Sequence, residues 1–360
     1  MKRILGLVCA AAMVLPLLLT GCQPGAGADA KVLNVCNWGD YIEVDDNNVS
    51  QVLKEFEAET GIKVNYSTFA SNEELYAKLT GAASQYDVIV PSDYMVERMA
   101  KKGMLEEIDK AALKDFSNID AEFQKMEFDP DGKYSVPYMW GTVGIVYNKD
   151  MVSEPVDSWS ILWDKKYEKK ILMYDSSRDS LAVAMMYKGF SSNSTNADEL
   201  KQAEQALIAQ KPLVLSYSLD DTRDKMLAGE AALAVVYSGD ATLIMQQAAE
   251  QGKNFGYCIP KEGSNIFMDN LCIVKGSKHK SAAMQFIDFL CRPEIVARNS
   301  EYIGYAPPEK AAYAQISDDL KGIPSFYPTD EERKRLTAYR DLGDFNAAIE
   351  ESWTRIKAAQ

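Results

Sequence analysis

The first twenty-two residues constrain this chain most, because they decide in which compartment it folds. Lys2 and Arg3 precede an apolar run over residues 4–19 that contains Pro16, and a Leu-Thr-Gly sequence then leads to Cys22. A basic start, a short apolar segment and small residues before a cleavage point are typical of a secretory signal. The run is shorter than a membrane-spanning helix needs, so a permanent membrane anchor is the weaker interpretation.

A cysteine at the cleavage point predicts a bacterial lipoprotein. We expect residues 1–21 to be the signal peptide, Cys22 to carry the lipid, and residues 22–31, which are mostly small, to form a tether. The protein would then be held on the bacterial cell membrane, outside the cytoplasm. Since residues 1–21 contain Lys2 and Arg3 but no acid, their loss changes the formal charge from −14 to −16. This charge argues against nucleic acid as a partner and suits a cationic ligand.

Four cysteines remain after the tether, and they show no metal-ligand spacing. They are Cys36, Cys258, Cys272 and Cys291, each in an apolar stretch of sequence. Free buried thiols are the expected state, although a disulfide is possible outside the cytoplasm. The sequence predicts neither a metal site nor a cofactor.

Strand and helix patterns alternate along the chain, which is typical of α/β layers around a mostly parallel sheet. Ser71 and Glu74 have the spacing of a capping box, and Gly61 is a good helix stop. The expected strands are 32–36, 62–66, 86–90, 171–175, 213–217, 232–237 and 266–274. The expected helices are 49–60, one opened by Ser71, 93–102, 181–190, 197–210, 221–228, 281–290 and 345–357.

The pattern restarts after a glycine-dotted, β-rich stretch at residues 137–148, which predicts a crossing between two lobes. We expect lobe 1 to comprise residues 32–140 plus 269–310, and lobe 2 to comprise residues 141–268 plus 311–360. Two α/β lobes joined by more than one crossing enclose a cleft, and clefts between lobes are where ligands bind.

Enzymatic chemistry has little support in the sequence. His279, the sole histidine, lies in a basic turn between lysines, where a solvated surface position is the better interpretation than a Ser–His–acid site or a metal site. There is no phosphate-binding glycine loop and no dinucleotide fingerprint. A hydrolase that uses two carboxylates stays open, because acids are abundant.

Aromatic residues stand beside polar or acidic residues near the ends of five expected strands. The groups are Trp38 with Asp40 and Tyr41, Ser92 with Asp93 and Tyr94, Asp175 with Ser176 and Asp179, Tyr237 with Asp240, and Phe267 with Asp269. Each group alone has an ordinary structural explanation, as core aromatics and helix caps. Five groups at comparable positions predict a binding crevice at the carboxyl ends of the strands.

These residues, with several short runs along nearly the whole chain, resemble the polyamine-binding subunits of ABC importers, the spermidine/putrescine-binding proteins. The runs are Asn37-Trp38, residues 59–64, 71–73, 90–92 and 136–141, Met268-Asp269, and residues 303–305. The resemblance implies a hinged, two-lobed periplasmic-binding fold of type II that holds putrescine or spermidine in its interlobe cleft. It also implies no catalysis, a monomer, and delivery of the ligand to a membrane permease with its ATPase.

The same resemblance assigns the site. It implies an aromatic box of Trp38, Tyr41, Tyr94, Tyr237, Phe267 and Tyr305, a polar contact at Ser92, and ligand carboxylates at Asp179, Asp240 and Asp269. Departures from the family pattern, such as Ser176 where spermidine-type members have an aspartate, favour putrescine. Two alternatives stay open beside this one: the two-carboxylate hydrolase, and a protein of the same fold that binds another cationic solute.

Overall fold

The computed structural model describes residues 32–81, 85–219 and 221–359. The expected signal peptide, Cys22 and the whole tether lie outside these ranges, so their predicted roles stay predictions. Within the described ranges, no helix combines the length and the apolar character that crossing a membrane requires.

The strands of the described residues join in one hydrogen-bonded order, β2-β1-β3-β9-β4-β7-β5-β6, with β10 beside β9 and β8 beside β4. Their bounds are β1 Val32–Trp38, β2 Lys63–Phe69, β3 Val88–Ile89, β4 Val136–Asn148, β5 Ile171–Tyr174, β6 Val214–Ser218, β7 Leu233–Tyr237, β8 Phe255–Cys258, β9 Ser264–Ile273 and β10 Leu336–Thr337. The expected strand at 86–90 is therefore shorter than its apolar run.

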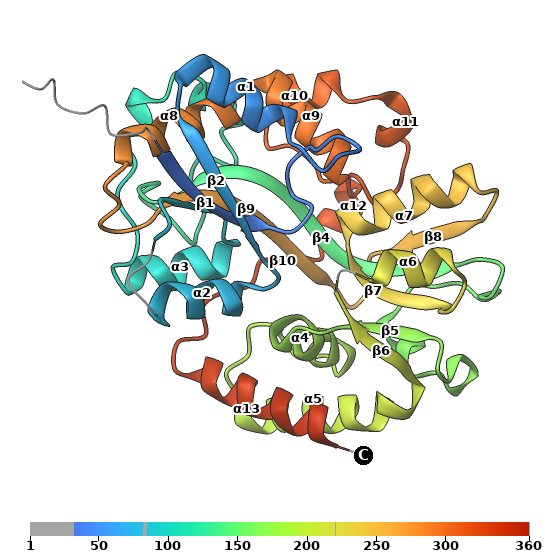
Figure 1. The fold of residues 1–360 in the computed structure, drawn as a ribbon. Helices are drawn as coiled ribbons and strands as arrows, with labels where there is room; N and C mark the ends of the chain where they lie inside the picture. Colours follow the sequence, from blue (N-terminus) through green and yellow to red (C-terminus); the bar gives the residue numbers. More distant parts are fainter. Residues whose placement is uncertain (1–31, 82–84, 220, 360) are drawn as a thin grey trace, which may run out of the picture.

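Helices cover this sheet on both sides (Figure 1). Their bounds are α1 Gln51–Thr60, α2 Asn72–Gly81, α3 Asp93–Lys101, α4 Ser177–Tyr187, α5 Ala197–Gln210, α6 Thr222–Leu227, α7 Ser238–Glu250, α8 Lys280–Leu290, α9 Pro293–Ile303, α10 Lys310–Gln315, α11 Asp318–Lys321, α12 Asp330–Arg333 and α13 Phe345–Ala358. The last long helix, α13, packs on α4 and α5 beside β5 and β6, at the bottom of Figure 1.

Parallel pairing of strands is found within each half of the sheet, and antiparallel pairing is found at the junction between the halves. Strand β1 pairs in parallel with β2 and β3, and β5 pairs in parallel with β6 and β7. Pairing is antiparallel where β9 meets β3 and β4, and where β4 meets β7 and β8. The expectation of a mostly parallel sheet is thus right within each half and wrong at the junction, because long strands that cross from one half to the other run back against their neighbours.

Strands β4 and β9 form that junction. The first part of β4 pairs with β9, from Val136 opposite Leu271 to Thr142 opposite Ile266. The second part of β4 pairs with β7, from Val143 opposite Tyr237 onward. The β-rich stretch at 137–148 therefore crosses between the two halves, as its sequence predicted. The α/β class and the two-part architecture are confirmed.

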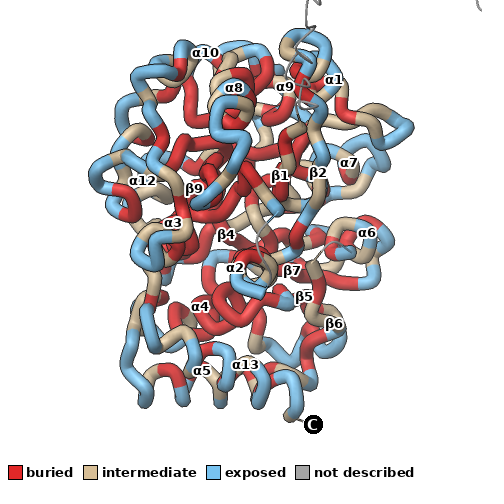
Figure 2. The backbone as a smooth tube through the Cα atoms, turned by 60° about the vertical axis from the view of Figure 1, so that its left-hand side comes forward, coloured by how far each residue is buried: buried red, intermediate tan, exposed pale blue. Residues whose placement is uncertain are grey.

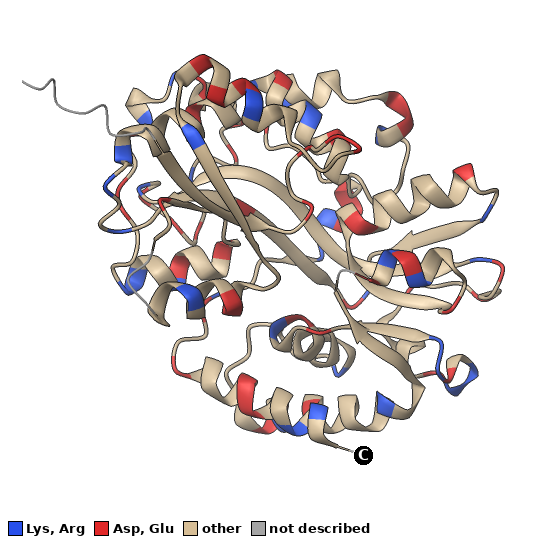
Figure 3. Cartoon of the chain, viewed as in Figure 1, with Lys and Arg blue, Asp and Glu red and all other residues tan. Residues whose placement is uncertain are grey.

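The core follows the strands and the helix faces turned toward them. Figure 2 shows buried backbone along β4, β9, β7 and α4, whereas α5 and α13 alternate between buried and exposed residues. Charged residues gather on the outer helices and loops, and the strands carry few (Figure 3). An aspartate buried at this sheet is therefore unusual and calls for a physical explanation.

Two helix starts show how the sequence positions these elements. Ser50 caps α1 by accepting a hydrogen bond from the Leu53 amide, and Gly61 ends it in the left-handed conformation at φ 67°. Helix α4 begins at Ser177, four residues before the expected start, because the Ser176 hydroxyl accepts a hydrogen bond from the Asp179 amide. Asp179 therefore lies in the first helical turn and not in a loop.

The capping pattern at Ser71 differs from the expected one in its return bond. The Ser71 hydroxyl accepts a hydrogen bond from the Glu74 amide, as expected for the start of α2. The Glu74 carboxylate accepts from the amide of Ala70 and not from that of Ser71. The reciprocal bond is thus displaced by one residue.

Candidate ligand-binding site

A cavity of about 380 Å³ lies at the carboxyl ends of β1, β3, β5 and β7, beside the middle of β9. All ten residues that the sequence analysis singled out as ligand contacts line it: Trp38, Tyr41, Ser92, Tyr94, Asp179, Tyr237, Asp240, Phe267, Asp269 and Tyr305. The structure therefore brings members of all five strand-end groups to one place, although Asp175 and Ser176 are not part of the lining. Their roles toward a ligand remain predictions.

Three helix N-termini carry acidic residues to this cavity. Asp93, Asp179 and Asp240 stand in the first turns of α3, α4 and α7, and all three line the cavity. The positive end of a helix dipole stabilises a carboxylate placed there, so these positions suit acids. The same dipoles would repel a cation, and those of the carboxylates that are ionised reverse that field. The local structure thus makes the cavity attractive to positive charge.

Asp269 is held rigidly by two hydroxyl groups. Tyr41 Oη donates to its Oδ2 at 2.6 Å, and Ser92 Oγ donates to its Oδ1 at 2.6 Å. Ser92 is the N-cap residue of α3, yet its hydroxyl makes no capping bond to the helix. Asp269 is 3% exposed. Its carboxylate is therefore buried at the cavity lining with its orientation fixed through both oxygens.

Asp179 has a similar but separate environment. Its Oδ2 accepts hydrogen bonds from Ser176 Oγ and Tyr237 Oη, both at 2.7 Å. Arg178 does not hold it, because the Arg178 guanidinium donates to Ser192 O and Asn193 Oδ1. Asp175 instead pairs with a lysine of α13. Among the described residues, Asp179 thus forms no salt bridge with the neighbouring Arg178.

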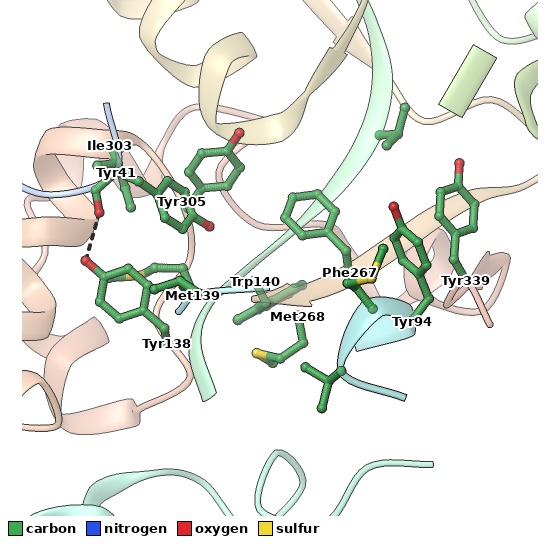
Figure 4. Close-up of a cluster of buried hydrophobic side chains, with 14 of the residues drawn as sticks. Tyr41, Tyr94, Tyr138, Met139, Trp140, Phe267, Met268, Ile303, Tyr305 and Tyr339 are labelled. Atoms are coloured by element: carbon green, nitrogen blue, oxygen red, sulfur yellow. Dashed lines mark hydrogen bonds between the residues drawn. The ribbon is translucent and has the colours of Figure 1, made fainter. Parts of the chain in front are cut away.

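Aromatic rings connect the carboxylates in a continuous wall. Ring centroids of neighbouring members lie 4.4–6.0 Å apart along the series Tyr41, Tyr305, Phe267, Tyr237 and Tyr174. Figure 4 shows Tyr41 and Tyr305 at one side of Phe267, and Tyr94 with Tyr339 at the other. The wall offers apolar faces and negative ring quadrupoles along its whole length.

A glycine allows this wall to close. A Cβ atom on Gly239 would lie 2.1 Å from Tyr305 Cε2, so the Tyr305 ring rests directly on the backbone of Gly239. This contact explains the glycine between Tyr237 and Asp240, at the start of α7. A larger residue there would displace the ring from the cavity.

Burial disfavours the ionised form of two cavity carboxylates. Loss of hydration raises the pKa of Asp269 to about 6, although the hydrogen bonds from Ser92 and Tyr41 oppose that rise. Burial also raises the pKa of Asp179, against the bonds from Tyr237 and Ser176. A nearby cation would restore part of the lost stabilisation of each ionised form. The electrostatics therefore favour a positively charged occupant.

Asp93 differs from the other carboxylates. It is 2% exposed, and burial, together with the Asp269 charge, raises its pKa to about 8. The backbone amides of Tyr94 and Met268 donate to it. At neutral pH Asp93 is thus largely protonated, and it serves the site as a neutral group that fixes β9 against α3.

The sequence analysis missed several cavity residues. They include Asn72, Tyr174, Arg223, Asn265 and Tyr339, whereas Asp93 belonged to a predicted strand-end group but was given no ligand role. Tyr174 ends β5 directly before Asp175, so its strand-end position was a usable signal. Tyr339 comes from a segment after β10 and had no such signal.

His279 and the cysteines lie apart from the cavity lining. The His279 ring is exposed, as expected, but its Nδ1 also lies 3.0 Å from the buried Asp87 carboxylate. The four described cysteines are free, and Cys258 is only partly buried. Among the described residues, no group of three or more histidine, cysteine or acidic side chains is placed to hold a metal ion.

Known proteins resemble this chain in sequence and fold. Residues 51–326 match the bacterial extracellular solute-binding protein family. The chain belongs to this family. It is 35% identical over 345 residues to the spermidine/putrescine-binding periplasmic protein of Salmonella typhimurium, covering 95% of this chain and 96% of that protein. It is 34% identical to the putrescine-binding periplasmic protein SpuD of Pseudomonas aeruginosa, covering 96% and 98%.

A solved structure agrees with these relatives. The putative spermidine/putrescine ABC transporter from Listeria monocytogenes superposes with a TM-score of 0.86 at 34% identity, over 92% of this chain and all of that one. The family resemblance predicted from the sequence is thus confirmed, and so is the two-lobed periplasmic-binding fold.

Proposed function

We propose that this protein is the extracytoplasmic substrate-binding subunit of a polyamine ABC importer, and that it binds putrescine or spermidine in the cavity between the two halves. The observation that carries the proposal is the combination of buried aspartates with a continuous aromatic wall. The relatives named for spermidine and putrescine support the same ligand class.

The physical chemistry of a diamine matches this cavity. Putrescine is an apolar chain with an ammonium group at each end. Removing an ammonium group from water costs several kcal/mol, so each end needs a carboxylate. At about 4 Å and an effective dielectric constant near 20, one such pair returns about 4 kcal/mol. Ring faces add roughly 0.5–2 kcal/mol per cation contact, and each buried methylene adds about 0.8 kcal/mol.

The positions of the carboxylates suggest which of them binds each ammonium end of the ligand. Burial and the charges of Asp240 and Asp269 raise the pKa of Tyr305, so both carboxylates lie near this ring. Asp179 accepts a hydrogen bond from Tyr237, and its charge helps to raise the pKa of Tyr94. We assign one ammonium group to Asp240 and Asp269 and the other to Asp179, with the methylenes along Phe267 and its neighbours.

A thermal-shift series tests the ligand class directly. Putrescine, cadaverine, spermidine and spermine would be compared with lysine and arginine. At 100 times its Kd, a ligand stabilises the folded state by about 2.7 kcal/mol. We expect a concentration-dependent rise in Tm with putrescine or spermidine and none with the amino acids. A flat response to every polyamine would contradict the proposal.

The remaining features of the transport role are part of the same proposal. Lobe 1 comprises residues 32–140 plus 269–310, and lobe 2 comprises residues 141–268 plus 311–360. The lobes close over the ligand by bending where β4 and β9 cross, and the closed monomer then docks on a permease.

A lipid on Cys22 holds the protein at the membrane. Scattering curves with and without putrescine test closure, and identical curves at saturation would contradict it.

A further inference from the structure

Arg223 is a cation built into the ligand cavity. It stands in the first turn of α6, lines the cavity, and donates from Nη2 to Asp240 Oδ1 at 3.3 Å. Its Nε–H is buried and makes no hydrogen bond within the described part of the chain. Helix α6 packs on α7, which carries Asp240. The guanidinium therefore occupies the side of the cavity where one end of a cationic ligand would bind.

The charge of Arg223 is felt by both tyrosines near this end. Burial and the Asp240 and Asp269 charges raise the pKa of Tyr305, and Arg223 opposes that rise. Burial and the Asp40 charge raise the pKa of Tyr302 on α9, and Arg223 opposes this rise as well. Of the two tyrosines only Tyr305 lines the cavity, so the guanidinium lies beside Tyr305 and Asp240, where an ammonium ion is proposed to bind.

The ion pair between Arg223 and Asp240 is weak by its geometry. A single hydrogen bond joins the two groups, and their side chains are 26% and 36% exposed. The pair between Arg340 and Glu97 differs, because Nε and Nη2 of Arg340 donate to the two carboxylate oxygens at 3.1 and 2.9 Å. A one-bond, partly hydrated pair is readily exchanged for another cation, whereas a two-bond pair is not.

We propose that the Arg223 guanidinium is an internal occupant of the ammonium site at Asp240, and that a ligand cation displaces it on binding. The inference rests on the proposed polyamine function. Arg223 partly neutralises the cavity while no ligand is bound, and it sets the affinity by competing with the ligand. It is a specificity-determining residue, because it penalises every ligand whose cation must reach Asp240.

Calorimetry on two variants separates this competition from a general charge effect. Arg223→Met removes the guanidinium and keeps an apolar stem of similar length. Lys225→Met removes the same charge from the same helix, and Lys225 pairs with Asp221 outside the cavity lining. We expect putrescine to bind Arg223→Met roughly fivefold more tightly than the wild-type protein, the scale of a weak, partly exposed ion pair. Binding to Lys225→Met should stay within about twofold.

Equal or weaker binding by Arg223→Met would overturn the inference. A crystal structure of the wild-type protein with putrescine gives a second test that needs no variant. The Arg223 Nη2 to Asp240 separation should then exceed salt-bridge range, with a ligand nitrogen in its place; an ion pair retained at its present length would overturn the inference. If the wild-type protein bound no polyamine, the proposed function would fail too, whereas tight wild-type binding with unchanged Arg223→Met affinity would remove this inference alone.

Discussion

Replacing Asp269 by asparagine should have opposite effects on ligand binding and on stability. The folded state raises the pKa of this carboxyl from 3.8 to about 6. A pKa difference of one between the folded and unfolded states is worth about 1.36 kcal/mol, so the ionised side chain opposes folding by about 3 kcal/mol at pH 7.5. The penalty grows as the pH rises from about 4 to 6, because the unfolded chain ionises first. It is nearly absent below about pH 3.

The asparagine variant should therefore be more stable than the wild-type protein when no ligand is present. Its amide keeps the shape of the carboxylate: one of the Tyr41 and Ser92 hydroxyls can keep donating to the amide oxygen, while the other rotates to accept from the NH₂ group. We expect a gain of up to about 3 kcal/mol at pH 7.5 and only about 0.5 kcal/mol at pH 4. Calorimetric unfolding of the ligand-free protein at both pH values measures it.

Putrescine binding should be lost in the same variant. The carboxylate contributes about 4 kcal/mol to an ammonium group about 4 Å away at an effective dielectric constant near 20. That energy corresponds to roughly a thousandfold in Kd. Titration calorimetry at pH 7.5 gives the affinity. Affinity equal to that of the wild-type protein, or a variant less stable than the wild-type protein at this pH, would refute the reasoning.

Asp129 provides a matched control. It is also buried, but its carboxylate accepts hydrogen bonds from the amides of Lys133, Tyr134 and Ser135 and from the Ser135 hydroxyl. It does not line the cavity. Asp129→Asn should destabilise the protein by about 2 kcal/mol, as expected when hydrogen bonds to a charged group are weakened. Its affinity for putrescine should not change.

Two further predictions follow from the cavity. Putrescine requires the ionised form of Asp269, whose pKa is about 6, so Kd should rise roughly tenfold between pH 7 and pH 5; a flat calorimetric profile would argue against this. Gly239→Ala forces the Tyr305 ring to move and should lower both affinity and stability, the latter by about 1–3 kcal/mol in thermal unfolding. Gly81→Ala, with no atom within 4 Å of the new Cβ, is its control, and equal effects of the two changes would contradict the packing argument.

Strand ends and their side chains could be read from the sequence because both follow local rules. Trp38 and Tyr237 end strands whose apolar runs are short and clear, and both line the cavity. The crossing at β4 was also readable, since a long β-rich run with glycines fits neither half alone. Local pattern and the carboxyl-end rule together locate the cavity without any knowledge of the folded contacts.

Contacts between distant parts of the chain could not be read in this way. Tyr339 reaches the cavity from beyond β10, and Arg223 meets Asp240 through the packing of α6 on α7. The antiparallel pairing of β9 with β3 depends on the direction in which a crossing strand returns, which periodicity does not encode. The start of α4 was predicted too late for a different reason. The capping residue Ser176 was present in the sequence, but the helix start was placed from the apolar pattern alone.

A direct titration of putrescine against 1-aminobutane and 1,4-butanediol tests the central claim, that carboxylates at the two ends of an aromatic cavity hold a dication. The three molecules share four carbons and differ in the number of positive ends. We predict binding of putrescine at least roughly a hundredfold tighter than that of 1-aminobutane, because the second carboxylate end then lacks a partner, and no measurable binding of the diol. Equal affinities for putrescine and 1-aminobutane, or tight binding of the diol, would contradict the account.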